Sequence, residues 1–221
     1  LSLLPEKLPD FKGFSITGYQ KTSSEVGGDY YDFFENPDGS FYAICGDATG
    51  HGLTAGNIVS ITKSVLVSSP LDNPKDILLQ LNKTLIKLKL GLNRMCANMV
   101  KVTGNKVVFT SAGMPPAYHY IAKKEEMNEI LIPGLPLGSL PNMIVNTKEI
   151  TLNSGDVFVM MSDGFPEAPN PAGELLSYET VEKCLHDNIN NDVTTMQNEL
   201  VRITDEWLAG GDLPDDCTMV I

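Results

Sequence analysis

The sequence predicts an α+β fold, a layered sandwich of antiparallel strands and paired helices. Three observations support this prediction. Short stretches of alternating polar and apolar residues are joined by tight turns, apolar residues at helical spacing form two pairs of segments, and 221 residues suit one domain better than two. Runs of strands with helices in separate pairs are typical of layered α+β domains. No internal repeat or low-complexity tract interrupts the pattern.

The chain begins with leucines separated by prolines. We interpret residues 1–12 as the end of an upstream linker helix and residues 13–221 as the domain. Alternation over residues 14–20 predicts the first strand. Residues 30–34 and 40–45 are expected to form a hairpin, because they flank the turn sequence Asn-Pro-Asp-Gly at 36–39.

Two helices are expected next. The first carries Ile58, Ile61 and Val65 at helical spacing, and Pro70 ends it. The second begins near Pro74 and is predicted to pack on a sheet through a row of leucines. These leucines are Leu78, Leu81, Leu85, Leu88 and Leu92.

From residue 94 the pattern returns to strands. The expected strands cover residues 95–103, 106–111, 117–122, 129–132, 144–152 and 156–161, with turns at 104–105 and 153–155. Two further helices are expected after Ser177 and after Asp192, and the second of them has an apolar stripe. Residues 218–221 close the chain as a strand.

Composition narrows the classes of function. The chain has 16 Lys and Arg against 28 Asp and Glu, a net charge of -12, which argues against direct contact with nucleic acid. The longest strongly apolar run, residues 157–161, is far shorter than the roughly 20 residues of a membrane helix, so we expect no membrane contact by this fragment. The four cysteines lack a C-x-x-C pair, as expected of reduced thiols in the cytoplasm. Because the first residue is leucine, we expect a piece of a longer chain, which as a whole could be membrane-tethered.

Aspartates at predicted strand ends, beside small residues, are the candidate functional groups. They are Asp29, Asp47, Asp163 and the adjacent pair Asp215 and Asp216. Any one of them could instead serve a turn, as Asp38 before Gly39 is expected to do. Carboxylates that converge without histidine or cysteine suit hard cations such as Mg²⁺ or Mn²⁺, and would repel one another without a cation.

Four segments occur in a characteristic order: residues 25–32, 46–52, 162–168 and 215–218. Together they resemble the metal-dependent PPM class of serine/threonine phosphatases, specifically its bacterial SpoIIE-type branch. Residues 4–9, 111–116 and 135–138 also match that branch, so the resemblance spans nearly the whole chain. It implies an α-β-β-α sandwich, in which a central antiparallel β-sandwich is flanked by helix pairs.

The resemblance also implies a centre of two Mn²⁺ or Mg²⁺ ions that activates a water for attack on phosphorus. Its protein ligands would be Asp29, Asp47, the backbone carbonyl of Ala48, Asp163 and Asp215. Asp47 would bridge both ions. Asp216 is the alternative to Asp215 if the match slips by one residue, and Asp32 is expected to be a hairpin residue rather than a ligand.

His51 matches a histidine for which a general-acid role has been proposed in the family. It would protonate the leaving seryl oxygen, and the alternative is a polar residue at a helix start. Two departures from the family pattern stand out. Met114 replaces a histidine, and the only arginines, Arg94 and Arg202, lie far from the front motifs. An arginine clamp on phosphate is therefore missing, so affinity would come from a protein–protein surface.

We expect a phosphatase that hydrolyses phosphoserine or phosphothreonine on a partner protein. Family context suggests an anti-anti-sigma (STAS-type) regulator as substrate in a partner-switching pathway. The domain would be the output end of a larger signalling protein, controlled by an upstream sensor or linker domain. The alternative is a catalytically inactive binding module of the same fold. The chain has no G-x-x-x-x-G-K-[ST] loop and no H-E-x-x-H motif, which argues against a different phosphoryl enzyme such as a kinase or a nucleotide hydrolase.

Overall fold

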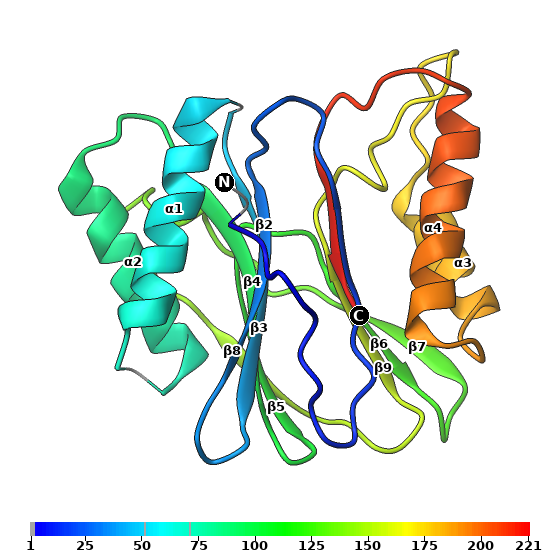
Figure 1. Cartoon of the computed structure of the whole chain (residues 1–221), viewed down its shortest axis with the longest axis horizontal. Helices are drawn as coiled ribbons and strands as arrows, with labels where there is room; N and C mark the ends of the chain where they lie inside the picture. The colour runs from blue at the N-terminus through cyan, green and yellow to red at the C-terminus, as the bar shows by residue number, and fades with distance from the viewer. Residues whose placement is uncertain (1–2, 51, 71) are drawn as a thin grey trace.

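Two antiparallel sheets pack face to face, and a pair of helices covers the outer face of each (Figure 1). The structure is a computed structural model and describes residues 3–50, 52–70 and 72–221. Within these ranges the β1 sheet has the strand order β1-β10-β9-β6-β7 and the β2 sheet the order β2-β3-β4-β5-β8. The layers follow one another as α1 and α2, the β2 sheet, the β1 sheet, then α3 and α4 (Figure 1). The predicted α-β-β-α sandwich is confirmed.

The strands follow the alternating segments of the sequence closely. The β1 sheet consists of β1 (Gly18–Lys21), β10 (Cys217–Val220), β9 (Val157–Met161), β6 (Ala117–Ile121) and β7 (Glu126–Ile130). The β2 sheet consists of β2 (Asp29–Glu35), β3 (Phe41–Ala48), β4 (Met95–Thr103), β5 (Lys106–Ala112) and β8 (Thr147–Thr151). The bounds of β4 are those predicted, whereas the first strand begins four residues later than expected, at residue 18 instead of 14.

Strand β3 explains how the layers share the core. Successive side chains of a strand point to opposite faces, and β3 is buried on both. Tyr42 and Ile44 therefore join the cluster under α1 and α2, while Phe41, Ala43 and Cys45 join the cluster between the sheets. A third cluster lies between the β1 sheet and the second helix pair. An apolar strand without strict alternation thus marks the centre of the sandwich.

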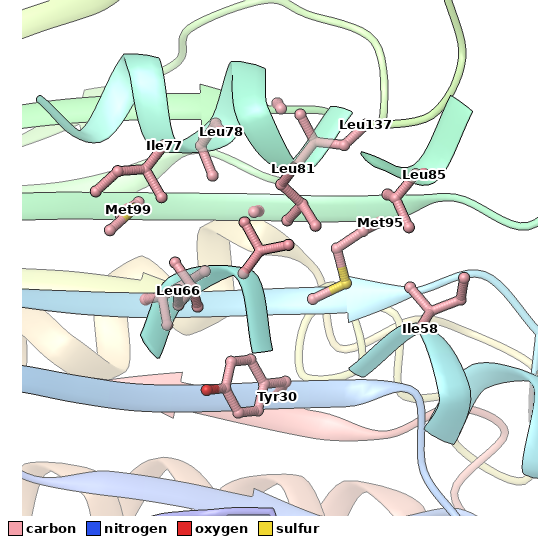
Figure 2. Close-up of a cluster of buried hydrophobic side chains, with 14 of the residues drawn as sticks. Tyr30, Ile58, Leu66, Ile77, Leu78, Leu81, Leu85, Met95, Met99 and Leu137 are labelled. Carbon is pink, nitrogen blue, oxygen red and sulfur yellow. The ribbon is translucent and has the colours of Figure 1, made fainter. Parts of the chain in front are cut away.

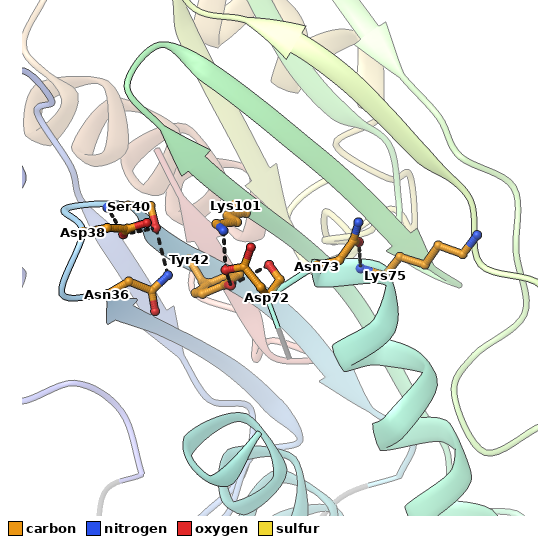
Figure 3. Close-up of polar contacts among 8 residues, drawn as sticks. All are labelled: Asn36, Asp38, Ser40, Tyr42, Asp72, Asn73, Lys75 and Lys101. Carbon is orange, nitrogen blue, oxygen red and sulfur yellow. Dashed lines mark hydrogen bonds and ion pairs between the residues drawn. The ribbon is translucent and has the colours of Figure 1, made fainter. Parts of the chain in front are cut away.

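Four helices lie within the described residues, and α2, α3 and α4 begin where the sequence predicts. The helices are α1 (Leu53–Ser68), α2 (Pro74–Leu88), α3 (Tyr178–Asp187) and α4 (Val193–Leu208). Ser177 and Asp192 cap α3 and α4 by accepting hydrogen bonds from backbone N–H groups of the first turn. Asn73 does the same for α2, where its side chain accepts from the Lys75 N–H at 2.9 Å (Figure 3). Among the described residues, no helix combines the length and hydropathy needed to cross a membrane.

The leucine row of α2 is shorter than predicted. Leu78, Leu81 and Leu85 are buried and meet side chains of β4 in the cluster drawn in Figure 2. Leu92, however, is 88% exposed. The helix ends at residue 88 because Lys89 adopts the left-handed conformation, with φ of 53°.

The hairpin between β2 and β3 turns at Asp38 and Gly39 as expected. The Asp38 carboxylate accepts from the backbone N–H of Ser40 at 2.9 Å, and Gly39 has a φ of 80° that favours glycine. Next to this turn, the Lys101 ammonium pairs with the Asp72 carboxylate (Figure 3). These contacts lie at the hairpin end of the sheet. Asp38 is therefore a turn residue.

Residues 3–12 contain no helix, so the expected helix end is wrong for this segment. Its prolines remove amide donors that a helix needs. Instead, Phe11 is buried and stacks on Phe41 with ring centroids 3.8 Å apart. The Leu3 carbonyl accepts from the Lys63 ammonium at 2.7 Å, which ties the segment to α1. The domain boundary at residue 13 stays a prediction.

Candidate metal and active site

Asp29, at the start of β2, lies beside Asp47, near the end of the neighbouring strand β3. They are direct partners in the antiparallel pairing of β2 with β3, which places Cβ atoms about 4.5–5.5 Å apart. Asp29 is buried, and its Oδ2 accepts a hydrogen bond from the Ser162 hydroxyl at 2.7 Å. Because Ser162 directly follows β9, the pair of carboxylates faces the β1 sheet.

Gly28 has no side chain, so it leaves space next to the Ala48 carbonyl oxygen. The Ala48 N–H donates to the Gly28 carbonyl at 2.9 Å, and a Cβ on Gly28 would lie 2.4 Å from the Ala48 carbonyl oxygen. No larger residue fits at position 28 without moving that backbone. The predicted backbone ligand and Asp29 are therefore held next to each other by the close approach of β2 and β3.

The second group of carboxylates comes from the β1 sheet. Asp163 follows β9 and Asp215 precedes β10, and these two strands are paired. A Cβ on Gly164 would lie 2.0 Å from the Asp216 carbonyl oxygen, so the two loops can touch only with glycine at position 164. This contact brings Asp163 next to Asp215.

The two groups are close enough to influence each other's charge. Burial, followed by the negative charges of Asp163, Asp215 and Asp216, raises the pKa of Asp47 to about 7. These residues are distant from Asp47 in sequence and come from the opposite sheet. Asp47 therefore lies within electrostatic range of the carboxylates of both sheets.

Two further carboxylates share this environment. Burial, and then the charge of Asp47, raises the pKa of Asp29 well above its usual range, while the hydrogen bond from Ser162 acts in the opposite direction. Burial, followed by the charge of Glu167, raises the pKa of Asp163. A bound cation would offset this repulsion.

Asp216 has a different task from Asp215. It is buried, and its two carboxylate oxygens accept from the backbone N–H groups of Ser23 at 2.7 Å, Gly28 at 2.7 Å and Asp29 at 3.2 Å. Asp215 is exposed and accepts from the Asp216 N–H at 2.8 Å. Since the oxygens of Asp216 are engaged by the loop before β2, the geometry favours Asp215 as the ligand.

Asp32 lies in β2 and points away from the carboxylate group. Its Oδ2 accepts from the Tyr30 hydroxyl at 2.6 Å and pairs with the Lys63 ammonium of α1 at 3.0 Å. It belongs to the hairpin, as expected, and it anchors a helix to the sheet. Met114, the departure from the family pattern, is a buried core residue between the sheets.

The donors fit the predicted ions by type: they are carboxylates and one carbonyl, the oxygen ligands that Mg²⁺ and Mn²⁺ prefer. Within residues 3–50, 52–70 and 72–221, no three His, Cys, Asp or Glu side chains are already placed to hold one ion directly. Coordination therefore stays a prediction. His51 lies outside the described residues, so its role also stays a prediction.

The sequence analysis missed Cys96. This thiol lies on β4 directly opposite Asp47, and burial together with the charge of Asp47 raises its pKa to about 12. No motif contains Cys96, because its place at the site depends on how β3 and β4 are aligned. Because α1 and α2 lie between β3 and β4 in the sequence, no turn sequence fixes this alignment and no local signal could have found Cys96.

The contact between Gly164 and the Asp216 carbonyl is testable. We expect Gly164→Ala to lower the free energy of unfolding by at least about 2 kcal/mol, because the added Cβ forces the two loops apart. Gly134→Ala is the matched control, since its Cβ would meet no atom closer than 3.6 Å. Urea unfolding measures both. Equal effects of the two substitutions would contradict the proposed packing.

The different tasks of Asp215 and Asp216 can also be separated. Asp216→Ala leaves buried N–H groups without an acceptor, and we expect it to lower the free energy of unfolding by about 3 kcal/mol. Asp215→Asn removes one exposed negative charge, so the metal-free protein should keep its stability while Mn²⁺ affinity falls at least tenfold. Urea unfolding and calorimetric Mn²⁺ titration measure these effects. The assignment is wrong if Asp215→Asn is the destabilised variant, or if it binds Mn²⁺ normally.

Comparisons with known proteins agree with this architecture. The family model described as stage II sporulation protein E (SpoIIE) matches residues 37–221, which include the segments around Asp47, Asp163 and Asp215. Phosphoserine phosphatase RsbU of Bacillus subtilis is 25% identical over the whole chain. The chain spans 66% of the length of RsbU and 39% of Protein IcfG of Synechocystis, which is 22% identical.

Solved structures share the fold. The SiaA-PP2C domain of Pseudomonas aeruginosa superposes with a TM-score of 0.82 at 20% identity, covering 93% of this chain and 84% of its own. RsbX, solved in complex with magnesium, superposes with a TM-score of 0.70 at 15% identity, covering 93% of this chain and 92% of its own. With most of its length matched by the family model and its motifs in order, the chain belongs to the SpoIIE family, the bacterial branch of the PPM-class phosphatases.

Proposed function

We propose that this chain is a metal-dependent phosphatase that removes phosphate from phosphoserine or phosphothreonine on a partner protein. The observation that carries the proposal is that aspartates from both sheets act electrostatically on Asp47. The relative RsbU, named as a phosphoserine phosphatase, supports the choice of reaction. The complete set of aspartates disfavours the alternative, an inactive binding module.

The metal ligands would be Asp29, Asp47, the Ala48 carbonyl, Asp163 and Asp215. When bound, two Mn²⁺ or Mg²⁺ ions would neutralise the phosphate and supply a nucleophile near neutral pH. Ser162 would hold the Asp29 carboxylate in position through its hydrogen bond. The buried Asp216 would hold the loop that carries Asp29. The complex of RsbX with magnesium supports this class of ion.

His51 would donate a proton to the seryl or threonyl oxygen as it leaves. Its sequence neighbour Gly52 donates a backbone hydrogen bond to the Val26 carbonyl at 3.0 Å, in the loop that leads to Asp29. That contact joins Gly52 to the loop that leads to Asp29, which supports the proposed role.

The substrate protein would be bound mainly through a protein–protein interface rather than through its phosphate. Neither arginine is available for phosphate: Arg94 donates to the carbonyls of Gly91 and Asn93, and Arg202 pairs with two glutamates on α4. Small phosphate esters would therefore bind weakly. A STAS-type regulator in a partner-switching pathway is the substrate we propose, with the chain as the output part of a longer signalling protein.

Turnover of a phosphorylated STAS protein tests the proposal. We expect phosphate release with Mn²⁺ and none with excess EDTA. Asp47→Asn and Asp163→Asn should each lower kcat/KM by about 1000-fold, because each removes a ligand that offsets charge in the transition state. Asp38→Asn, in the turn at the opposite end of β2 and β3, is the control that keeps activity. Absence of metal-dependent release by the natural protein, or full activity of Asp47→Asn, would refute the function.

A further inference from the structure

Two loops lie beside the candidate site and pack on each other. Residues 89–94 join α2 to β4, and residues 131–146 join β7 to β8. The first loop touches the segment that follows Asp47: the Arg94 N–H donates to the Thr49 hydroxyl at 2.9 Å, and the Thr49 N–H donates to the Arg94 carbonyl at 3.1 Å. Strand β4 then begins directly opposite Ala48, the predicted backbone ligand. The loop after α2 is therefore part of the rim of the candidate site.

The second loop is fixed against the first and against α2. Leu137 exchanges two backbone hydrogen bonds with the first residue of β4, at 2.8 and 3.1 Å. The buried Asn82 of α2 holds the bend that follows: its Oδ1 accepts from the Gly138 N–H at 2.7 Å, and its Nδ2 donates to the Leu140 carbonyl at 3.0 Å. A Cβ on Gly138 would lie 3.4 Å from the Arg94 side chain, so the two loops are in contact. They form one surface at the rim.

Leucine side chains on both loops face solvent. Leu92 is 88% exposed, Leu140 51% and Leu135 48%, whereas Leu137 in the second loop is buried. Exposed leucines that occur singly need no explanation, but a group of them at the rim of a site is typical of a surface that binds another protein. We call Leu92, Leu135 and Leu140 the loop patch.

Positive charge is concentrated in the same part of the chain. The net charge of the protein is -12, yet residues 77–124 contain eight of its 16 Lys and Arg and no Asp or Glu, and residues 130–148 contain no acidic residue either. Lys87 and Lys89, at the end of α2, are exposed, and within the part of the chain that the structure describes neither forms an ion pair. The loop patch is therefore bordered by positive charge, opposite in sign to the protein as a whole.

We propose that the loop patch, together with Lys87 and Lys89, docks the phosphoprotein substrate through a surface of that protein that is apolar and acidic around its phosphorylated residue. The inference rests on the proposed function and names the part of this chain that recognises the substrate. Charge complementarity selects the partner, because an acidic surface is attracted by these lysines and repelled by the rest of the chain. The exposed leucines supply the affinity that an arginine clamp on phosphate would otherwise give.

The unphosphorylated STAS protein is the probe, because its binding needs neither turnover nor metal. We expect Leu92→Asp to weaken the Kd about tenfold or more, measured by calorimetric titration in EDTA, since the substitution puts a negative charge into an apolar contact with an acidic partner. Its thermal unfolding should match that of the natural protein, because the side chain is exposed. Val67→Asp is the matched control that keeps the affinity: Val67 is 65% exposed and lies in the last turn of α1, whereas the first turn follows the candidate site.

Salt dependence tests the charged part of the surface. Binding by the natural protein should weaken as NaCl is raised, because salt screens exposed charges. Lys89→Asn should make the Kd less dependent on salt, and asparagine also tolerates the left-handed conformation of this position. Lys106→Asn is the control that keeps the natural salt dependence, since Lys106 is exposed at the start of β5, at the opposite end of β4 from the patch.

Three results would overturn the inference even if Mn²⁺-dependent hydrolysis is intact. They are absence of binding by the natural protein, equal Kd values for Leu92→Asp and Val67→Asp, and self-association that Leu92→Asp abolishes in sedimentation experiments, which would assign the loop patch to a second copy of the chain. Conversely, binding that depends on Leu92 in a protein that releases no phosphate would support the docking surface and refute only the proposed phosphatase.

Discussion

The buried carboxylate of Asp216 is the contact on which the candidate site depends. It stands just before β10 in one sheet and accepts backbone N–H groups of the loop that leads into β2 of the other. A buried carboxylate is tolerated when amide donors replace its water, and here these donors come from the opposite sheet. Gly27 and Gly164 permit the approach, since a Cβ on either would lie within 2.4 Å of an Asp216 atom. These contacts join the two sheets at the strand ends that carry the other aspartates.

This closure forces like charges together. The pKa of Asp47 rises to about 7 through burial and through the charges of aspartates from the other sheet. Such an arrangement lowers the stability of the metal-free fold and is relieved by cations, which links metal affinity to folding. The same property that makes the site costly to assemble is the one that a metal-dependent phosphatase needs.

Local sequence was sufficient for most of the fold, and it singled out the candidate aspartates, whose role as metal ligands stays a prediction. The turns and caps placed β4 and the starts of α3 and α4, since those signals act over a few residues. Local sequence was not sufficient where contacts between residues far apart in the sequence determine the structure. Residues 3–12 are held by packing of Phe11 on Phe41, and no local signal distinguishes Asp215 from its neighbour, because only burial separates them. The place of Cys96 follows from strand alignment and has no motif.

The most direct test is the stability of the metal-free protein against pH, compared with Asp47→Asn. The pKa of Asp47 is raised in the folded state from 3.8 to about 7, so its ionisation opposes folding, and stability should fall as pH rises through that interval. Relative to Asp47→Asn, the natural protein should lose on the order of 2 kcal/mol between about pH 5 and 8, and Mn²⁺ should restore it at the higher pH. Parallel pH profiles for the two proteins, with no stabilisation by Mn²⁺, would contradict the account.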